Sequence, residues 1–556
     1  MKQWLTIILA IYCLSLPGIT DSAWQEFQKE IGIQAAQYKN SSLHLEQRLQ
    51  PTRSYQVGDT DTFWRWNLSV MPPLWIQTAA TCRAVGEHSY IFVADSEWNV
   101  HMTQANVDTI LVRLEQNTPN NPNQGAIMMD VELFGAIPDE LDNDPKLIVF
   151  YSALGSFQGS TFDGYFSAYN QVTEAEAQQM NPSGHSNECE MIYMTCYPLN
   201  PVAPIRMSVL AHELEHLIHW GQDPNEQTWI DEGCAELAMV AYGIPDPISG
   251  FNSNPDNDLT AWNQTTADYV KVMLFFTYLQ EHHDETGLIR DLVADPANGI
   301  ASLEYQFNLH YPQLSLGELL RNWNVANAID QPQIADGLYN YSALTLPTFT
   351  STSLTQYPNN TNQSISAYAA DYLTRVLPQE GFGVSFQVSS PVYITAIVFD
   401  EAGLCTAVID GGIVDQLQLT SFPVGTYKVV FVISNTNSNA VTYSYTSGTV
   451  ANDDNIALVS RAELECYPNP FRWDEAGMQI KVNNSKSTAT KAKMEIYNLK
   501  GQLIQTILLH PGQGANALEA NWNGKNSQNK TVANGIYLMR YSDGTESLTK
   551  RISLVR

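Results

Sequence analysis

The spacing of apolar residues divides the chain into a mixed region and a later region made of strands. Three short apolar runs are rich in β-branched and aromatic residues, which is typical of buried strands. They cover residues 89–94, 146–151 and 190–195. Three longer segments place their apolar side chains at helical spacing instead. They cover residues 107–115, 266–283 and 316–329, the last preceded by a capping box of Ser315 and Glu318. Residues 89–345 therefore predict an α+β domain.

From about residue 346 the pattern changes to alternating strands separated by Gly, Asn and Ser. Residues 392–399 and 427–433 are clear examples of these strands. Polar stretches at 350–364 and 434–454 predict linkers or long surface loops. This pattern predicts a β-sandwich domain over residues 346–450.

The last part of the chain, residues 460–556, has its own set of alternating strands. Turn residues at Asn498–Gly501 and Ser542–Gly544 separate them. This arrangement predicts a second, smaller β-sandwich of the Ig-like type. Because 556 residues are enough for each region to bury its own core, we expect a multidomain protein.

The N-terminus has the layout of a secretory signal peptide. An apolar run from Trp4 to Leu16 is followed by Pro17-Gly18 and small or polar residues, so we expect residues 1–22 to be removed. The run is shorter than the roughly 20 apolar residues that a membrane-spanning helix needs, and no later segment is long and apolar enough. We therefore expect a soluble protein outside the cytoplasm. Residues 23–88 form an N-terminal segment, and whether it is a propeptide remains open.

The formal charge of −30 at pH 7 comes from 58 acidic and 28 basic residues. Most of the acidic excess precedes residue 457, and the rest of the chain is mildly basic. A negative field repels phosphate backbones and anionic headgroups, so we expect neither nucleic acid nor an anionic membrane surface as a partner. Solubility outside the cell accounts for the charge without any preference for cationic substrates.

The cysteines do not form a disulfide framework. Cys13 lies in the predicted signal peptide, and the others are too sparse for a disulfide scaffold, although their even number allows some bridges in an oxidising compartment. Cys189 and Cys196 are the one close pair, for which a disulfide and two buried thiols both remain open. No pair has the CxxC spacing of a structural zinc site.

The main candidate chemistry lies in the segment HELEH, residues His212 to His216. Residues four apart on an α-helix lie one turn apart on the same face, so His212 and His216 can bind one metal ion. Glu213 is offset by about 100° along the same turn, which places it beside a metal-bound water rather than on the metal. That position suits a general base. Apolar residues on both sides of the segment favour a buried helix.

A catalytic zinc takes three protein ligands and leaves one position open for water. The best third ligand is Glu232 in the segment WIDEGCAE, where we expect a helix to begin at Gly233 and return to the first helix. His219 shares the helical face, but it lies about 10.5 Å from His212 along the axis, too far for one ion with bonds of about 2 Å. We expect His219 to line the cleft or to bind a carbonyl. The chain also lacks the third histidine of the metzincin motif, because Gln222 occupies that position after His216.

The segments LAHELEHLI and WIDEGCAE together resemble the HExxH…E arrangement of gluzincins, and they are similar to hyicolysin-type secreted bacterial metallopeptidases. The similarity covers roughly residues 90–329. It implies a zincin-like metallopeptidase domain with zinc ligands at His212, His216 and Glu232. The same resemblance makes Glu213 the catalytic carboxylate and Glu236 a carboxylate that orients a ligand histidine.

The aminopeptidase branch of gluzincins has a tyrosine beyond the third ligand that stabilises the oxyanion. Tyr269 is the nearest match in this chain, and its alternative role is that of one more aromatic residue on a packed helix face. Our hypothesis for the mechanism is that zinc lowers the pKa of its bound water and polarises the scissile carbonyl. Glu213 then takes the proton from that water and delivers it to the leaving amine.

Two other functions remain open beside a peptidase. A zinc-binding surface protein without activity would bind the metal without turnover, and a metallohydrolase of a non-peptide bond would cleave esters or other amides but not proteins. Oxygen donors are also concentrated at Asp139–Asp144 and Asp256–Asp258. Neither loop follows the EF-hand pattern, so bound calcium and plain solvated turns are both open there.

The last region carries a second resemblance. It opens with YPNPF at Tyr467–Phe471 and continues with YNLKGQ, WNG, ANGIY and a basic end at Lys550-Arg551. This order resembles the C-terminal sorting domain of the type 9 secretion system, which is related to the Ig-like domain of flagellar hook-capping proteins. It covers about residues 463–556 and implies export by that machinery to the surface or surroundings of a two-membrane bacterium. The alternative is an ordinary accessory β-domain.

Overall fold

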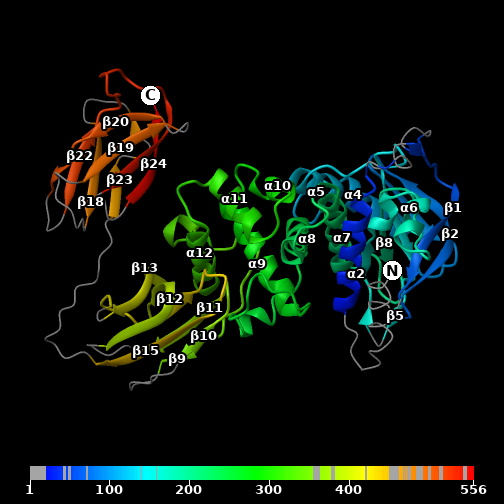
Figure 1. Ribbon diagram of the computed structural model, residues 1–556, viewed down its shortest axis with the longest axis horizontal. Helices are drawn as coiled ribbons and strands as arrows, with labels where there is room; N and C mark the ends of the chain where they lie inside the picture. The colour runs from blue at the N-terminus through cyan, green and yellow to red at the C-terminus, as the bar shows by residue number, and fades with distance from the viewer. Residues whose placement is uncertain are drawn as a thin grey trace. The chain divides into compact units, whose positions relative to one another are not determined.

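The computed structural model divides into two compact units, Met1–Thr449 and Val450–Arg556, which are described separately (Figure 1). All structural statements concern the residues whose placement is described. They are 21–39, 41, 46–47, 52–70, 73–139, 141–157, 160–354, 363–376, 382–419, 422–449, 463–467, 469, 471–472, 477–483, 492–498, 502–512, 517–542 and 547–555. Residues 1–20 of the predicted signal peptide lie outside them. Among the described helices, none has the length and apolar character needed to cross a membrane.

A six-stranded sheet forms the first part of the larger unit. Its strands lie in the order β1-β2-β3-β4-β8-β7. They are β1 (Thr60–Asn67), β2 (Leu74–Val85), β3 (Ser89–Ala94), β4 (Leu147–Ser152), β8 (Met191–Thr195) and β7 (Gly164–Phe166). β3, β4 and β8 are parallel and buried along their whole length, which confirms the three strands predicted from apolar runs.

Two strands of this sheet precede Ser89, where the sequence places the start of the α+β domain. β1 pairs antiparallel with β2, and β2 pairs antiparallel with β3. Phe63 and Cys82 on these strands are buried in the same core as Phe92 of β3. The boundary expected at Ser89 therefore falls inside the sheet. Both strands have many exposed and half-buried positions, so no continuous apolar run marks them in the sequence.

Helices form a core with both faces of the sheet. Ile91, Val149 and Ile192 face one core, which they share with α4 (Gln104–Glu115), α5 (Ala126–Phe134), α7 (Pro204–Gln222), α8 (Thr228–Tyr242) and α9 (Thr266–His283). Phe92 and Phe150 face the opposite core, which includes α2 (Asp21–Ala36) and α6 (Glu174–Met180). The candidate chemistry lies on α7 and α8, and the sheet supports these helices from one side.

The later helices of the larger unit agree with their sequence pattern. α9 covers the predicted residues 266–283, and α12 (Leu316–Ile329) begins with the predicted capping box. Its Ser315 hydroxyl accepts a hydrogen bond from the Glu318 backbone, and the Glu318 carboxylate accepts one from the Ser315 backbone. Two shorter helices, α10 (Leu288–Val293) and α11 (Ile300–His310), lie between them in the sequence.

Residues 352–449 form one seven-stranded sheet rather than the two sheets of the expected sandwich. The order is β10-β15-β12-β14-β11-β9, with β13 paired to β12. The strands are β9 (Thr352–Ser353), β10 (Gln363–Ile365), β11 (Ala370–Val376), β12 (Phe382–Phe399), β13 (Cys405–Leu419), β14 (Lys428–Ser434) and β15 (Val441–Thr449). The sheet is continuous because β12 is one long strand. Its first half pairs with β15 and its second half with β14, and both halves face one core.

This second sheet also shares a core with the helices that precede it. Tyr372 and Phe399 belong to the same buried cluster as Trp323 of α12. The Tyr372 hydroxyl donates a hydrogen bond to the Asn324 carbonyl at 2.8 Å. The change of pattern near residue 346 thus marks a change of secondary structure inside one compact unit.

The second unit consists of two sheets around a common core. Their orders are β16-β18-β22-β21 and β17-β24-β23-β19-β20. The strands are β16 (Glu463–Tyr467), β17 (Phe471–Arg472), β18 (Met478–Asn483), β19 (Lys493–Asn498), β20 (Leu503–Ile507), β21 (His510–Pro511), β22 (Leu518–Trp522), β23 (Gly535–Ser542) and β24 (Ser547–Val555). Trp522 of the first sheet and Tyr541 of the second are buried in the same core, as in a sandwich. Of the predicted turns at Asn498–Gly501 and Ser542–Gly544, residues 499–501 and 543–544 lie outside the described residues.

The cysteines among the described residues are all free and buried. Cys189 and Cys196 therefore do not form the disulfide that the sequence leaves open. β8 runs between them in extended conformation, at about 3.3 Å per residue, so their sulfur atoms cannot approach bonding distance.

Candidate metal centre

α7 places the two histidines of HELEH on one side of the helix. Pro204 stands in its first turn, where no intrahelical hydrogen bond is lost, and Leu210, Leu214 and other apolar residues of the helix are buried in the core. The Nε2 atoms of His212 and His216 are 3.2 Å apart. Both imidazoles therefore direct a potential ligand atom to the same place.

α8 supplies the predicted third ligand. The helix begins at Thr228 rather than at Gly233, so Glu232 lies within a helix that packs against α7. Glu232 Oε2 is 3.7 Å from His212 Nε2 and 3.9 Å from His216 Nε2. Ligands of a tetrahedral zinc with bonds of about 2.0–2.1 Å are about 3.3 Å from one another. The three atoms thus form a triangle, called the zinc triangle below, of nearly the size that zinc requires.

The surroundings of the zinc triangle favour a cation. Glu232 Oε2 is buried without a hydrogen-bond partner among the described residues. Burial raises the pKa of Glu232 to about 8, against the opposing effect of His216. Burial and the neighbouring His216 lower the pKa of His212 to about 3. Two imidazoles and one carboxylate are a donor set that fits zinc.

Glu213 lines the same pocket without belonging to the zinc triangle. It is 8% exposed, and burial raises the pKa of its carboxyl to about 7. The charge of His216 and a hydrogen bond from the Phe166 backbone on β7 oppose this rise. Gly164 on the same strand leaves room for it, because a Cβ there would lie 3.1 Å from Glu213 Cγ. A carboxyl that titrates near neutral pH can both accept and return a proton.

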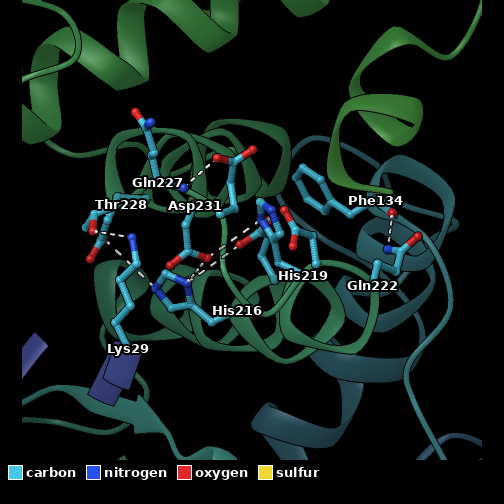
Figure 2. A network of polar contacts seen from close by, with 12 residues as sticks. Lys29, Phe134, His216, His219, Gln222, Gln227, Thr228 and Asp231 are labelled. Carbon is cyan, nitrogen blue, oxygen red and sulfur yellow. Dashed lines mark hydrogen bonds and ion pairs between the residues drawn. The ribbon is translucent and has the colours of Figure 1, made fainter. Parts of the chain in front are cut away.

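Asp231 holds His216 in place, a role that the sequence did not predict. Its Oδ1 is 3.1 Å from His216 Nδ1, the ring nitrogen that points away from the zinc triangle (Figure 2). Although burial opposes it, this pairing raises the pKa of His216 and lowers the pKa of Asp231. Such a contact fixes the tautomer and orientation of a ligand histidine. Its place directly before Glu232 in the sequence is the one signal that could have indicated it.

Glu236 lies beside the other histidine. It follows Glu232 by one turn of α8, and its Oε1 is 3.6 Å from His212 Nδ1. That separation is longer than a hydrogen bond, and among the described residues neither His212 Nδ1 nor Glu236 Oε2 has a hydrogen-bond partner. The orienting role of Glu236 stays a prediction, with the side chain on the expected side of His212.

Tyr269 and His219 differ in their relation to the pocket. Tyr269 on α9 lines it together with the zinc triangle, and its ring packs edge-on against Trp262 with centroids 4.9 Å apart. Its role in stabilising an oxyanion stays a prediction. His219 lies behind the zinc triangle, 1% exposed, with Nδ1 3.0 Å from Glu215 Oε1. It therefore pairs with a carboxylate instead of lining the cleft or binding a carbonyl.

The zinc triangle opens into a pocket of about 290 Å³. Residues 164–166 of β7, the last strand of the sheet, form one wall. Lys29 and Gly32 of α2 form part of another wall. Lys29 Nζ donates to Thr228 Oγ1 at 3.5 Å (Figure 2). Trp220 Nε1 donates to the Gly32 carbonyl at 3.0 Å. The N-terminal helix is thus a component of the site.

The two acidic loops differ in how their carboxylates are used. Asp139 and Asp142 each place an oxygen within 4.8 Å of the other and of an oxygen of Glu190. Asp256 and Asp258 instead accept hydrogen bonds from backbone amides of residues 366 and 260. The second loop therefore uses its carboxylates to hold the backbone, and calcium at the first loop stays a prediction.

Comparison with known proteins identifies the C-terminal region. The family model described as FlgD Ig-like domain matches residues 469–546. This match agrees with the two-sheet architecture of the second unit, which is an Ig-like domain. No curated protein matches the chain.

Likeness to solved structures is low. PorZ from Porphyromonas gingivalis, described as a surface component of the type-IX secretion system, is 19% identical over 23% of this chain and 15% of PorZ, with a TM-score of 0.14. Latent PorU from the same organism is 14% identical over 37% of this chain and 19% of PorU, with a TM-score of 0.15. A DUF4785 family protein from Legionella pneumophila is 12% identical over 38% of this chain and 70% of its own, with a TM-score of 0.14. These scores do not assign the chain to any of these folds.

Proposed function

We propose that the chain is a secreted zinc metallopeptidase of the gluzincin type, with a zincin-like catalytic region. The observation that carries the proposal is the zinc triangle of His212, His216 and Glu232, with Glu213 beside it in one pocket. Zinc bound there would polarise a carbonyl and lower the pKa of a water molecule. The other steps of the proposed reaction are assigned to side chains around the zinc triangle.

Glu213 is the general base of the proposed reaction. It accepts the proton of the attacking water and then delivers it to the leaving amine, for which its pKa of about 7 is suited. Asp231 keeps His216 oriented for binding through its contact with Nδ1. Tyr269 on α9 also lines the pocket, and it is the candidate hydrogen-bond donor to the oxyanion that forms at the carbonyl.

The position of β7 favours a peptide as the substrate. β7 ends the sheet, pairs antiparallel with β8 and lines the pocket next to Glu213. The edge of a strand offers backbone N–H and C=O groups that an extended peptide can pair with. A small ester has no such repeated groups, so this wall supports peptide hydrolysis over a non-peptide substrate.

The variant Glu213→Gln tests the proposal. Glutamine keeps the size of the side chain but cannot take a proton, so we expect kcat/KM on an unfolded protein substrate to fall at least about a hundredfold. Zinc content and melting temperature should equal those of the wild type. Glu304→Gln makes the same change at an exposed position of α11 and should leave the activity intact.

Mass spectrometry of the products identifies the bond that is cleaved. Full activity in Glu213→Gln would remove Glu213 from its role. A zinc-loaded wild type that yields no peptide products would favour an inactive binding protein or a hydrolase of another bond.

We also propose that the second unit directs export through the type 9 secretion system of a two-membrane bacterium. Its Ig-like architecture, the YPNPF segment and the basic end at Lys550-Arg551 support this role. Placement at the cell surface or in the medium would bring the pocket to protein or peptide substrates outside the cell.

A further inference from the structure

A second group of side chains of the kind that binds metals lies behind the zinc triangle. Glu215 and His219 stand on α7 and Cys234 on α8, and one ligand atom from each lies within 4.8 Å of the others. None of the three is more than 1% exposed. Asp130 on α5 is also fully buried, and burial together with the charge of Glu215 raises the pKa of its carboxyl.

The polar atoms of this group are incompletely satisfied. His219 Nδ1 is 3.0 Å from Glu215 Oε1, whereas His219 Nε2 and Glu215 Oε2 have no hydrogen-bond partner in the described part of the chain. The same holds for both carboxylate oxygens of Asp130. A buried polar atom without a partner costs about 1–3 kcal/mol, and more when it is charged. Several such atoms around one place point to a missing ligand.

The charges of the group also indicate that a cation is missing. His219 Nδ1 is 3.0 Å from Glu215 Oε1, and His216 Nδ1 is 3.7 Å from the other oxygen of Glu215. Within the group itself, His219 is the one basic side chain beside the fully buried acidic side chains of Glu215 and Cys234. A divalent cation would balance them and would also use the open atoms.

We infer that Glu215, His219 and Cys234 bind a second, structural zinc ion. A thiolate beside an imidazole and carboxylates selects zinc over calcium or magnesium, which prefer oxygen ligands alone. Complete burial fits a closed structural site rather than a catalytic one.

The second ion would fix the helices that build the first site. Glu215 and His219 lie on the same helix as His212 and His216, and Cys234 follows Glu232 by two positions. An ion that joins α7 to α8 there holds the two helices in the register that brings Glu232 to the histidines. This inference concerns different ligands from the proposed catalytic zinc and stands without it.

Cobalt substitution of the full chain distinguishes the two sites. The zinc triangle contains no sulfur, so a thiolate-to-cobalt charge-transfer band in the near ultraviolet can come only from a cysteine ligand. We expect wild-type protein to hold two zinc ions per chain by elemental analysis, and the cobalt form to show this band. Cys234→Ser should lose the band and one ion, whereas Cys405→Ser should lose neither.

Variants of the zinc triangle complete the test. Glu232→Gln should lose one ion and keep the thiolate band, which shows that the second site does not depend on the first. Circular dichroism reports whether each variant is folded. The cobalt spectrum of the wild type tests the second site without any substitution. One ion per chain and no thiolate band in the wild type would overturn the inference and leave protons on Asp130 and Cys234 as the solution to the buried charge.

Discussion

The position of Glu213 depends on the absence of a side chain at Gly164. A Cβ at residue 164 would lie 2.8 Å from Met194 Sδ, 2.9 Å from the Tyr193 carbonyl oxygen and 3.1 Å from Glu213 Cγ. Backbone atoms of β8 cannot yield, so the strand or the glutamate must move. The proposed base is thus held by the close approach of β7 to α7.

Gly164→Ala should therefore impair catalysis more than folding. We expect kcat/KM to fall about ten- to a hundredfold, since a displacement of about 1 Å at a reacting group costs that much. Zinc content should remain that of the wild type. Steady-state kinetics and elemental analysis check this, with Gly317→Ala on α12 as the control, where a Cβ would meet side-chain atoms of Tyr393 and Thr436. Unchanged kinetics in Gly164→Ala would show that β7 does not set the position of Glu213.

Helical spacing was sufficient to place His212, His216 and Glu213 from the sequence. All three lie on one continuous helix, whose geometry is the same wherever it occurs. Asp231 and Gly164 were beyond such an argument, because their roles arise only where two elements meet. His219 lies outside the zinc triangle, as its distance from His212 along the helix predicted. Its actual partner, Glu215, was not predicted.

At the scale of elements, the contact between α8 and α9 shows how a glycine was misinterpreted. We expected a helix to begin at Gly233, and glycine is unfavourable inside one. It lies instead within α8, where a Cβ would be 2.3 Å from Cδ2 of Phe276 on α9. The glycine therefore serves close packing between two helices, which no local pattern reveals.

Gly233→Ala should destabilise the protein despite the higher helix propensity of alanine. Overpacking against Phe276 costs about 1–3 kcal/mol, while the propensity gain is about 1 kcal/mol. Because Glu232 is the adjacent residue, we also expect weaker zinc binding. Denaturant unfolding and zinc titration measure the two effects. The double variant Gly233→Ala with Phe276→Leu should recover part of both, and a single variant at least as stable as the wild type would contradict this account.

At the scale of the whole molecule, the sequence predicted the kinds of secondary structure better than the limits of the compact units. The alternation that begins near residue 346 correctly indicated strands, but it gave no sign that Tyr372 packs in one core with Trp323. Likewise, the continuity of β12 depends on which strands pair, and pairing is a long-range property. The Ig-like domain was easier to predict, because its motifs are local and its core is its own.

Removal of residues 457–556 should block export without harming the larger unit. In a bacterium that has the type 9 secretion system, we expect the shortened chain to accumulate in the periplasm with the zinc content of the full chain. Immunoblots of periplasm and medium measure its location. Residues 457–556 fused to an unrelated periplasmic protein should carry it outside. A shortened chain that reaches the medium as fully as the intact one would refute the sorting role.

The wall that α2 contributes to the pocket has a consequence for the order of events in folding. The contact between Gly32 and Trp220 closes a loop of 188 residues, and the contact between Lys29 and Thr228 closes one of 199. Contacts of such separation form slowly, because the entropy of closing the loop is lost before the contact is gained. The pocket is therefore among the last features of the larger unit to mature. During synthesis, α2 leaves the ribosome long before α7 and α8, which hold the residues that it contacts.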